Sequence, residues 1–197
     1  MRYVTLICLA LCALLTGCSA LPYAHQIDKT VLMEVLGVDA GVGETVTVTA
    51  ASGARSGDQD PLALPAQAGT ISAPCAEMGQ RGEDFVFFGD VEQVLVGEEE
   101  ARRGLEPLLG HMARDPELRL EAELWVVKGT EAAQLLLEAG EGESLPERLS
   151  AMSRNAELLG GPRPQMARGA LTDLLENGAT LLPALERREA EDGQGAQ

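Results

Sequence analysis

Aromatic residues and lysine are scarce in this chain of 197 residues. Aromatics make up 3% of the sequence although 45% of it is hydrophobic, so Leu, Val and Ala must supply most of the core. Lysine occurs only as Lys29 and Lys128, and the formal net charge is −16. A surface this acidic repels nucleic-acid phosphates and gains nothing from anionic lipids. We therefore expect no nucleic-acid partner.

A short apolar run, Val4–Leu15, follows the N-terminus. A bilayer span needs about 20 residues, so this length fits the apolar region of a signal peptide instead. The run ends in Leu15, Thr16, Gly17 and Cys18. This pattern predicts a bacterial lipobox, in which the Cys18 thiol receives a diacylglycerol and the signal peptidase recognises the three residues before it. An ordinary secretory signal with a cysteine placed there by chance is the alternative.

The predicted lipidation site and the composition of the chain together imply four parts. Residues 1–17 form a lipoprotein signal peptide and residues 18–26 a lipidated tether. Residues 27–185 form one domain, and residues 186–197 form a polar tail that is predicted to be disordered. Because two acyl chains give stable attachment, the protein is expected at the membrane surface despite its acidic charge.

Cysteine is too rare for a disulfide in the predicted mature protein. Cys8 and Cys12 lie in the signal peptide and Cys18 would carry lipid, which leaves only Cys75. A single thiol is either a nucleophile or a small buried hydrophobic group. The small, apolar neighbours of Cys75 favour burial.

Periodicity predicts a hairpin at the start of the domain. Ile27–Asp39 and the alternating Thr45–Ala50 read as two strands around a glycine-rich turn. Ser52–Gly69, rich in Gly, Ser, Asp and Pro, reads as a loop. A short helix is expected at Thr70–Gly79, with Ser72 as its N-cap.

The stretch Phe85–Gly129 holds all three Phe residues and the only Trp, which marks it as the centre of the core. Phe85–Val96 reads as one bent strand or two short ones. A helix is expected from Glu98 to Arg114, with either a kink near Gly104 or a second helix that starts at Pro107. A strand follows over residues 118–127. The apolar face of the helical stretch comprises Ala101, Leu105, Leu108, Leu109 and Met112.

The rest of the chain is predicted to be mainly helical. Thr130–Ala139 begins with Thr130 as N-cap, and Ser144 opens a second helix with a capping box. Gln165–Asn177 forms a third helix with Gly178 as C-cap, and Ala179–Leu185 a last strand. The inward side chains are expected to be Leu145, Leu149, Met152, Ala156 and Leu159 in the second helix, and Met166, Leu171, Leu174 and Leu175 in the third.

No pattern of residues indicates catalysis, a metal or a cofactor. Neither His25 nor His111 belongs to a hydrolase or zinc motif. His111 adjoins the apolar stripe of the predicted helix and is expected on the helix surface or at the boundary of the core. Four arginines gather around the central helix, where they could hold an acidic partner or a carboxylate ligand. Pairing with nearby acids is the favoured interpretation. They are Arg102, Arg103, Arg114 and Arg119.

Several short motifs follow one another in a recognisable order. They are Leu15-Thr16-Gly17-Cys18, Leu36-Gly37-Val38-Asp39, Phe87-Phe88-Gly89, Val94-Leu95-Val96-Gly97-Glu98-Glu99, Ala101-Arg102-Arg103-Gly104-Leu105, Arg114-Asp115-Pro116-Glu117, Val126-Val127-Lys128-Gly129 and Leu182-Pro183. In order and spacing this set resembles the Ger(x)C, or GerAC-like, spore germination lipoproteins, the C subunits of nutrient germinant receptors.

The resemblance implies an α/β fold with a mixed β-sheet flanked by helices. It implies a lipoprotein on the outer face of the spore inner membrane that works beside the two membrane subunits of the receptor and is not an enzyme. Members of that family usually continue into further domains, so a truncated or short variant is expected here. Ser19-Ala20-Leu21-Pro22 also replaces a Trp-Asp pair that is typical of many members.

Two other functions stay open from the residues alone. The second in rank is a lipid-anchored extracytoplasmic protein that binds a small ligand. The third is a hydrolase, which would need Cys75 or a serine within reach of His111.

Overall fold

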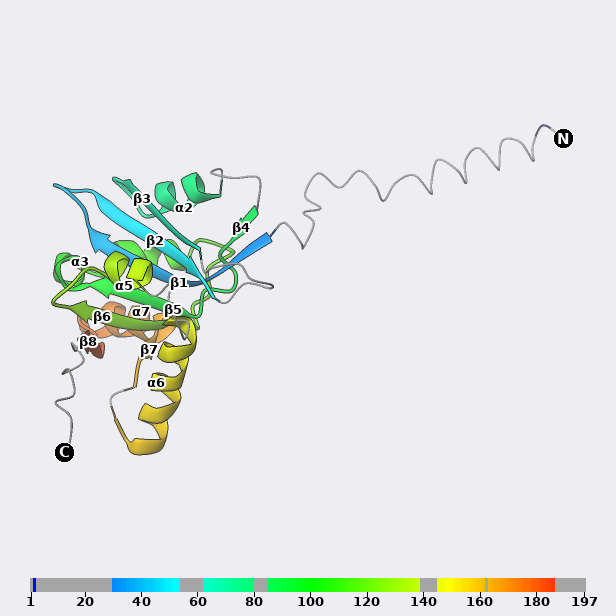
Figure 1. Cartoon of the computed structure of the whole chain (residues 1–197). Coiled ribbons are helices and arrows are strands. Elements are labelled where there is room, and N and C mark those ends of the chain that lie inside the picture. Colours follow the sequence, from blue (N-terminus) through cyan, green and yellow to red (C-terminus); the bar gives the residue numbers. More distant parts are fainter. Residues whose placement is uncertain are drawn as a thin grey trace, which may run out of the picture. The chain divides into compact units, whose positions relative to one another are not determined.

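The structure is a computed structural model, and it describes residue 2 and residues 30–53, 62–79, 85–138, 145–161 and 163–186. Figure 1 shows a sheet with helices on both faces. The strands are β1 (Thr30–Ala40), β2 (Val46–Ser52), β3 (Ala63–Ala68), β4 (Phe85–Phe87), β5 (Gln93–Gly97), β6 (Glu123–Lys128), β7 (Gln165–Met166) and β8 (Ala184–Glu186). The helices are α2 (Ser72–Met78), α3 (Glu98–Arg103), α4 (Glu106–Met112), α5 (Ala132–Glu138), α6 (Leu145–Leu159) and α7 (Ala167–Asn177).

The sheet is mixed, as the resemblance implied. Its main path runs β3-β2-β1-β5-β6-β7, with β4 paired to β1 and β8 paired to β6. The neighbours β1, β5 and β6 are parallel, whereas the β1–β2 hairpin, β3 and β7 are antiparallel additions. The predicted α/β class is therefore confirmed.

Two hydrophobic clusters lie on opposite faces of the sheet. One joins β1 and β2 to α2, α4 and α7, and the other packs α5 and the start of α6 against β5 and β6. A register shift between Met33 and Val35 puts a bulge into β1. Since a bulge adds one residue, Leu36 and Val38 share a cluster with Met33.

The prediction of a loop over Ser52–Gly69 is wrong for the second half of this range. Residues 63–68 form β3, which pairs with β2 through Ala51↔Ala63 to Val46↔Ala68. Its sequence, ALPAQA, has low strand propensity and contains Pro65. Because β3 ends the main path of the sheet, the missing N–H of Pro65 is tolerated there.

Several predicted boundaries also shift. The central strand β6 begins at Glu123 rather than at residue 118. Gln165 and Met166 form the short strand β7 before α7 instead of its first turn. Ser72 is the first residue of α2, and Ile71 occupies the N-cap position without a side-chain hydrogen bond.

The central helical stretch follows the sequence closely. Glu98–Arg103 is α3, and α4 begins at Glu106 with Pro107 in its first turn. Gly104 between them has φ +118°, which a residue with a side chain rarely adopts. Leu105, Leu108, Leu109 and Met112 are buried, and Ala101 is partly buried against them.

The apolar faces predicted for the last two helices are buried only in part. Leu149 of α6 is buried, but Met152 and Leu159 are exposed, and Figure 1 shows α6 projecting from the sheet. Met166 and Leu175 also face solvent, whereas Leu171 and Leu174 are partly buried against the core, as predicted, beside the buried Ala167 and Ala170. Gly178 caps α7 with φ +71°, as expected.

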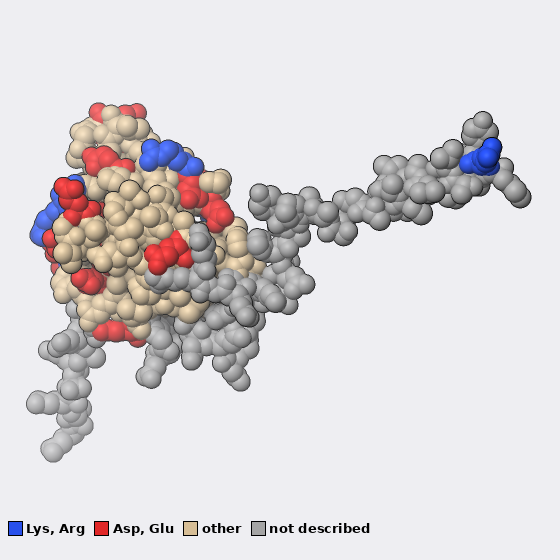
Figure 2. Space-filling model, turned by 90° about the horizontal axis from the view of Figure 1, so that it is seen from above, with Lys and Arg blue, Asp and Glu red and all other residues tan. Residues whose placement is uncertain are grey.

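The surface agrees with the composition. Figure 2 shows acidic side chains spread over the visible face, with basic ones lying beside them. None of the helices in the described part is long and apolar enough to cross a membrane. Apart from Arg2, the predicted signal peptide lies outside the described residues, as do the tether with Cys18, Ser144 and the tail beyond Glu186.

Candidate functional site

Three parallel strands end at one edge of the sheet. β1 ends beside Asp39, β5 at Gly97 and β6 at Lys128, and α3 and α5 start just after the last two. Ligands of open α/β sheets usually bind beyond the carboxyl ends of the strands. A ligand site of this sheet is therefore expected at this carboxyl edge.

Asp39 links β1 to the start of α5. Its Oδ1 accepts a hydrogen bond from Ala132 N and its Oδ2 accepts one from Ala133 N, both at 2.8 Å. The carboxylate thereby satisfies two donors at the positive end of the helix. The predicted N-cap, Thr130, instead donates to Gln134 Oε1. The sequence placed Asp39 at the end of a strand and in a motif, but its role at the start of α5 was not predicted.

Two glycines make room for this link. A Cβ on Gly37 would lie 2.7 Å from Leu136 Cδ1 of α5, so glycine allows the helix to pack closely on β1. A Cβ on Gly97 would collide with Asp39 Oδ1. The motif Leu36-Gly37-Val38-Asp39 therefore has a physical role in joining β1 to α5.

A cleft of about 670 Å³ lies at the same edge of the sheet. Its walls are the β1–β2 turn, the entry to α2, and the helices α3 and α4. A volume of roughly 300–1,000 Å³ is usual for small-molecule sites. The residues that line it include Val46, Ile71, Glu100, Arg103, Pro107, His111 and Arg114.

The arginines in and next to this cleft have different partners. Arg103 donates from Nη1 to Thr45 O at 3.2 Å and from Nη2 to Gly41 O at 3.3 Å, which holds the β1–β2 turn. Arg102 pairs with Glu98 at 2.6 Å, so pairing with neighbouring acids is confirmed for it. Arg114 forms no ion pair with a carboxylate in the described part of the chain.

Two buried polar atoms of the cleft residues have no hydrogen-bond partner among the described residues. They are Glu100 Oε2 and His111 Nε2. Arg103 Nη1 lies 3.7 Å from Glu100 Oε2, and Asp115 Oδ2 lies 3.7 Å from His111 Nε2, both beyond hydrogen-bond distance. Burial raises the pKa of Glu100 and lowers the pKa of His111, since each charged form is poorly solvated.

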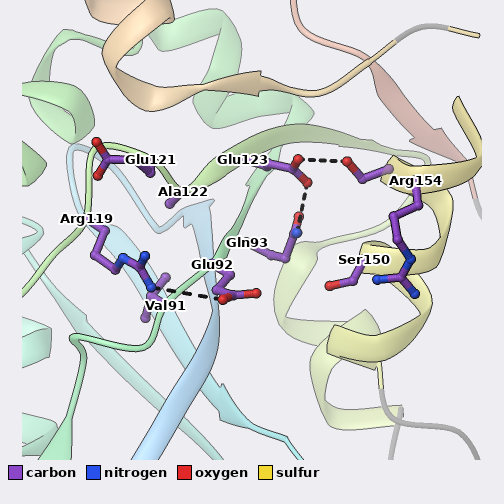
Figure 3. A pocket seen from close by; sticks show the side chains of 10 residues that line it. Val91, Glu92, Gln93, Arg119, Glu121, Ala122, Glu123, Ser150 and Arg154 are labelled. Carbon is purple, nitrogen blue, oxygen red and sulfur yellow. Dashed lines mark hydrogen bonds and ion pairs between the residues drawn. The ribbon is translucent and has the colours of Figure 1, made fainter. Parts of the chain in front are cut away.

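A second, smaller cleft of about 240 Å³ lies at the amino ends of β5 and β6 (Figure 3). Gln93 donates to Glu123 Oε2 at 2.9 Å, Ser153 donates to Glu123 Oε1 at 2.7 Å, and Trp125 Nε1 donates to Gln93 Oε1 at 2.6 Å. These bonds tie both strands to α6. Because its buried groups satisfy one another, this network is best explained as structural.

The described residues do not assemble a nucleophile with a base. Cys75 is buried, as predicted, and burial raises its pKa to about 12, which keeps the thiol protonated. Ser72 shares the larger cleft with His111, but its hydroxyl lies 3.3 Å from Thr70 Oγ1. No hydrogen bond joins either residue to His111 within the described ranges. Over the same ranges, no three His, Cys, Asp or Glu side chains group as a metal site.

Comparison with protein families is decisive for identity. The family model described as the spore germination protein N-terminal domain matches residues 24–187. The chain belongs to this family. The description of the family ties the domain to spore germination. The motifs of the GerAC-like resemblance from Leu36 to Pro183 lie within the matched residues, whereas Leu15-Thr16-Gly17-Cys18 precedes them. No curated protein and no solved structure matches the chain.

Mild acid is expected to stabilise this spore germination domain. Burial is the largest cause that raises the pKa values of Glu34, Asp39 and Glu100 above those of the unfolded chain. The folded state therefore binds more protons than the unfolded state above pH 4–5, and stability is lost as pH rises through the folded pKa values. His111, whose pKa is lowered, opposes this trend below about pH 6.5.

The measurement is the melting temperature of the purified protein at pH 7, 6 and 5. We expect it to rise on acidification, with a smaller rise in Glu100→Gln. A melting temperature that falls steadily from pH 7 to pH 5 would contradict the assignment.

Proposed function

We propose that the protein is a non-enzymatic, lipid-anchored subunit of a nutrient germinant receptor. It is held on the outer face of the membrane by lipid at Cys18 and works beside two membrane subunits. The observation that carries this proposal is the family match over residues 24–187, which begins shortly after the lipobox pattern Leu15–Cys18. The match ties the domain to germination, and the lipobox supplies an attachment that the acidic surface does not.

The geometry of the reactive side chains supports a role without catalysis. The Cys75 thiol is buried and protonated at neutral pH. The carboxylates of Asp39 and Glu123 each accept a hydrogen bond at both oxygens. These hydrogen bonds hold helices to strands. A domain whose helices are held to its strands in this way, on a lipid tether, suits a component that positions other subunits at the membrane.

Co-isolation from spores tests the assembly. The tagged full chain, solubilised from spore membranes in mild detergent, is expected to bring down two membrane proteins encoded beside it. Spores without the gene are expected to lose their response to one class of nutrients and to keep the response to a trigger that bypasses receptors. A protein that is isolated alone, from spores whose nutrient response does not depend on it, would overturn the proposal.

A further inference from the structure

The apolar stripe of α6 continues past the edge of the sheet. Near the start of the helix, Leu149 is 2% exposed and belongs to the core cluster of β5 and β6. In the second half, Met152 is 46% exposed, and Leu158 and Leu159 are 81% and 85% exposed. Figure 1 shows this half of α6 standing clear of the sheet. The described residues therefore leave the end of the stripe uncovered.

Two contacts place α6 at the edge of the sheet where β1, β5 and β6 begin. Ser153 donates to Glu123 Oε1 at 2.7 Å, at the first residue of β6. Glu147 in the first turn of α6 and Glu34 of β1 line one small cavity. Figure 3 shows α6 beside these strand ends. The exposed half of the helix thus projects from the amino edge of the sheet.

The chain enters the domain at the same amino edge. β1 begins at Thr30, and its residues before Val35 extend past the start of β5, because Val35 pairs with Gln93. Cys18, the predicted lipid site, lies 12 positions before Thr30. A chain of that length spans at most about 43 Å. Lipid on Cys18 therefore keeps the amino edge, with α6, within this distance of the membrane surface.

The charge of this segment differs from that of the rest of the chain. Residues 148–163 carry three arginines and one glutamate, whereas the whole chain has a net charge of −16. Arg148, Arg154 and Arg163 are all exposed. Arginine beside exposed leucine is typical of helices in the membrane interface, because the leucines enter the acyl boundary while the guanidinium groups stay among the phosphates.

We propose that the second half of α6 lies in the headgroup region of the membrane, with Met152, Leu158 and Leu159 toward the acyl chains. The amino edge of the sheet then faces the bilayer, and the larger cleft at the carboxyl edge faces away from it. This inference rests on the proposed anchor at Cys18. Three side chains offer no more apolar surface than one myristoyl chain, which alone binds only marginally. The anchor makes the contact effective by keeping α6 at high local concentration at the surface.

Quenching by brominated lipid tests this contact. The full chain carries Leu158→Cys in a Cys75→Ala background, with a fluorophore on the new thiol, in vesicles of phosphatidylcholine and phosphatidylglycerol. Val42→Cys is the matched control, because Val42 is 87% exposed but lies in the turn after β1, at the carboxyl edge. Since interfacial helices bury their apolar face by about 5–10 Å, quenching at position 158 should exceed that at position 42 at least about three-fold. Adding Leu159→Asp should remove most of this difference.

Flotation of the same vesicles on a density gradient measures the anchor separately from the contact. Protein that floats, with both labels quenched equally, would overturn the contact and leave the anchor intact. Protein that does not float would overturn both. A label at position 158 that brominated lipid does not reach, but that spore membranes shield from iodide, would place a protein on this face and so refute the lipid contact.

Discussion

Replacement of Cys18 by alanine is expected to move the protein from the membrane fraction to the soluble fraction. The lipobox interpretation places both acyl chains on this thiol, and stable anchoring takes two lipid signals, since a single myristoyl chain binds with only about 10⁴ M⁻¹. The acidic body, with a net charge of −16, adds no attraction to anionic lipid. The uncleaved run Val4–Leu15 is too short for a stable span of about 20 residues.

Fractionation and incorporation of radiolabelled palmitate measure this effect together. The variant should lose all label and most of its membrane association. Cys75→Ala is the matched control, because Cys75 is the other cysteine outside the predicted signal peptide, and it should keep both. A Cys18→Ala protein that stays with the membrane after a salt wash would refute the anchor.

Replacement of Asp39 by alanine is expected to lower the free energy of unfolding by about 2–4 kcal/mol, from loss of a helix cap plus two buried N–H groups left without acceptors. The acceptor serves Ala132 and Ala133, so the loss frees the start of α5 from β1. Asp39→Asn keeps one acceptor oxygen and should lose roughly half as much. Because a domain is stable by only about 5–15 kcal/mol, such a change is easily measured.

Urea denaturation of the full chain in detergent gives these values. Asp90→Ala is the matched control, because Asp90 forms no hydrogen bond or ion pair in the described part of the chain, and its effect should stay within about 0.5 kcal/mol. If Asp39→Ala is no more destabilising than this control, the carboxylate does not hold α5 in solution.

The spacing of apolar residues was enough to predict those helices that pack through one regular face. The stripe Leu105, Leu108, Leu109 and Met112 recurs at helical spacing, and these residues are buried. Pro107 and Gly178 act through their own backbone, so the break between α3 and α4 and the end of α7 were predictable. The same periodicity failed for the outer half of α6, because an apolar stripe does not say whether a neighbour covers it.

Pairing between residues that are far apart along the chain could not be predicted from the sequence. Residues 63–68 form a strand because β2 offers its free edge, although their own propensity is low. Asp39 and Ala132 are 93 positions apart, and Trp125 and Gln93 are 32 apart. No window of local sequence contains both partners of such a bond.

By itself, then, the sequence determined the composition of the core, the central strand–helix–strand unit and the order of motifs that led to the family. Each of these depends on residues close together in the chain. Only the tertiary structure decided that Asp39 caps α5 and that Glu100 and Arg114 share one cleft. The physical reason is that the parallel order of β1, β5 and β6 brings their carboxyl ends together, and that order is a property of the whole sheet.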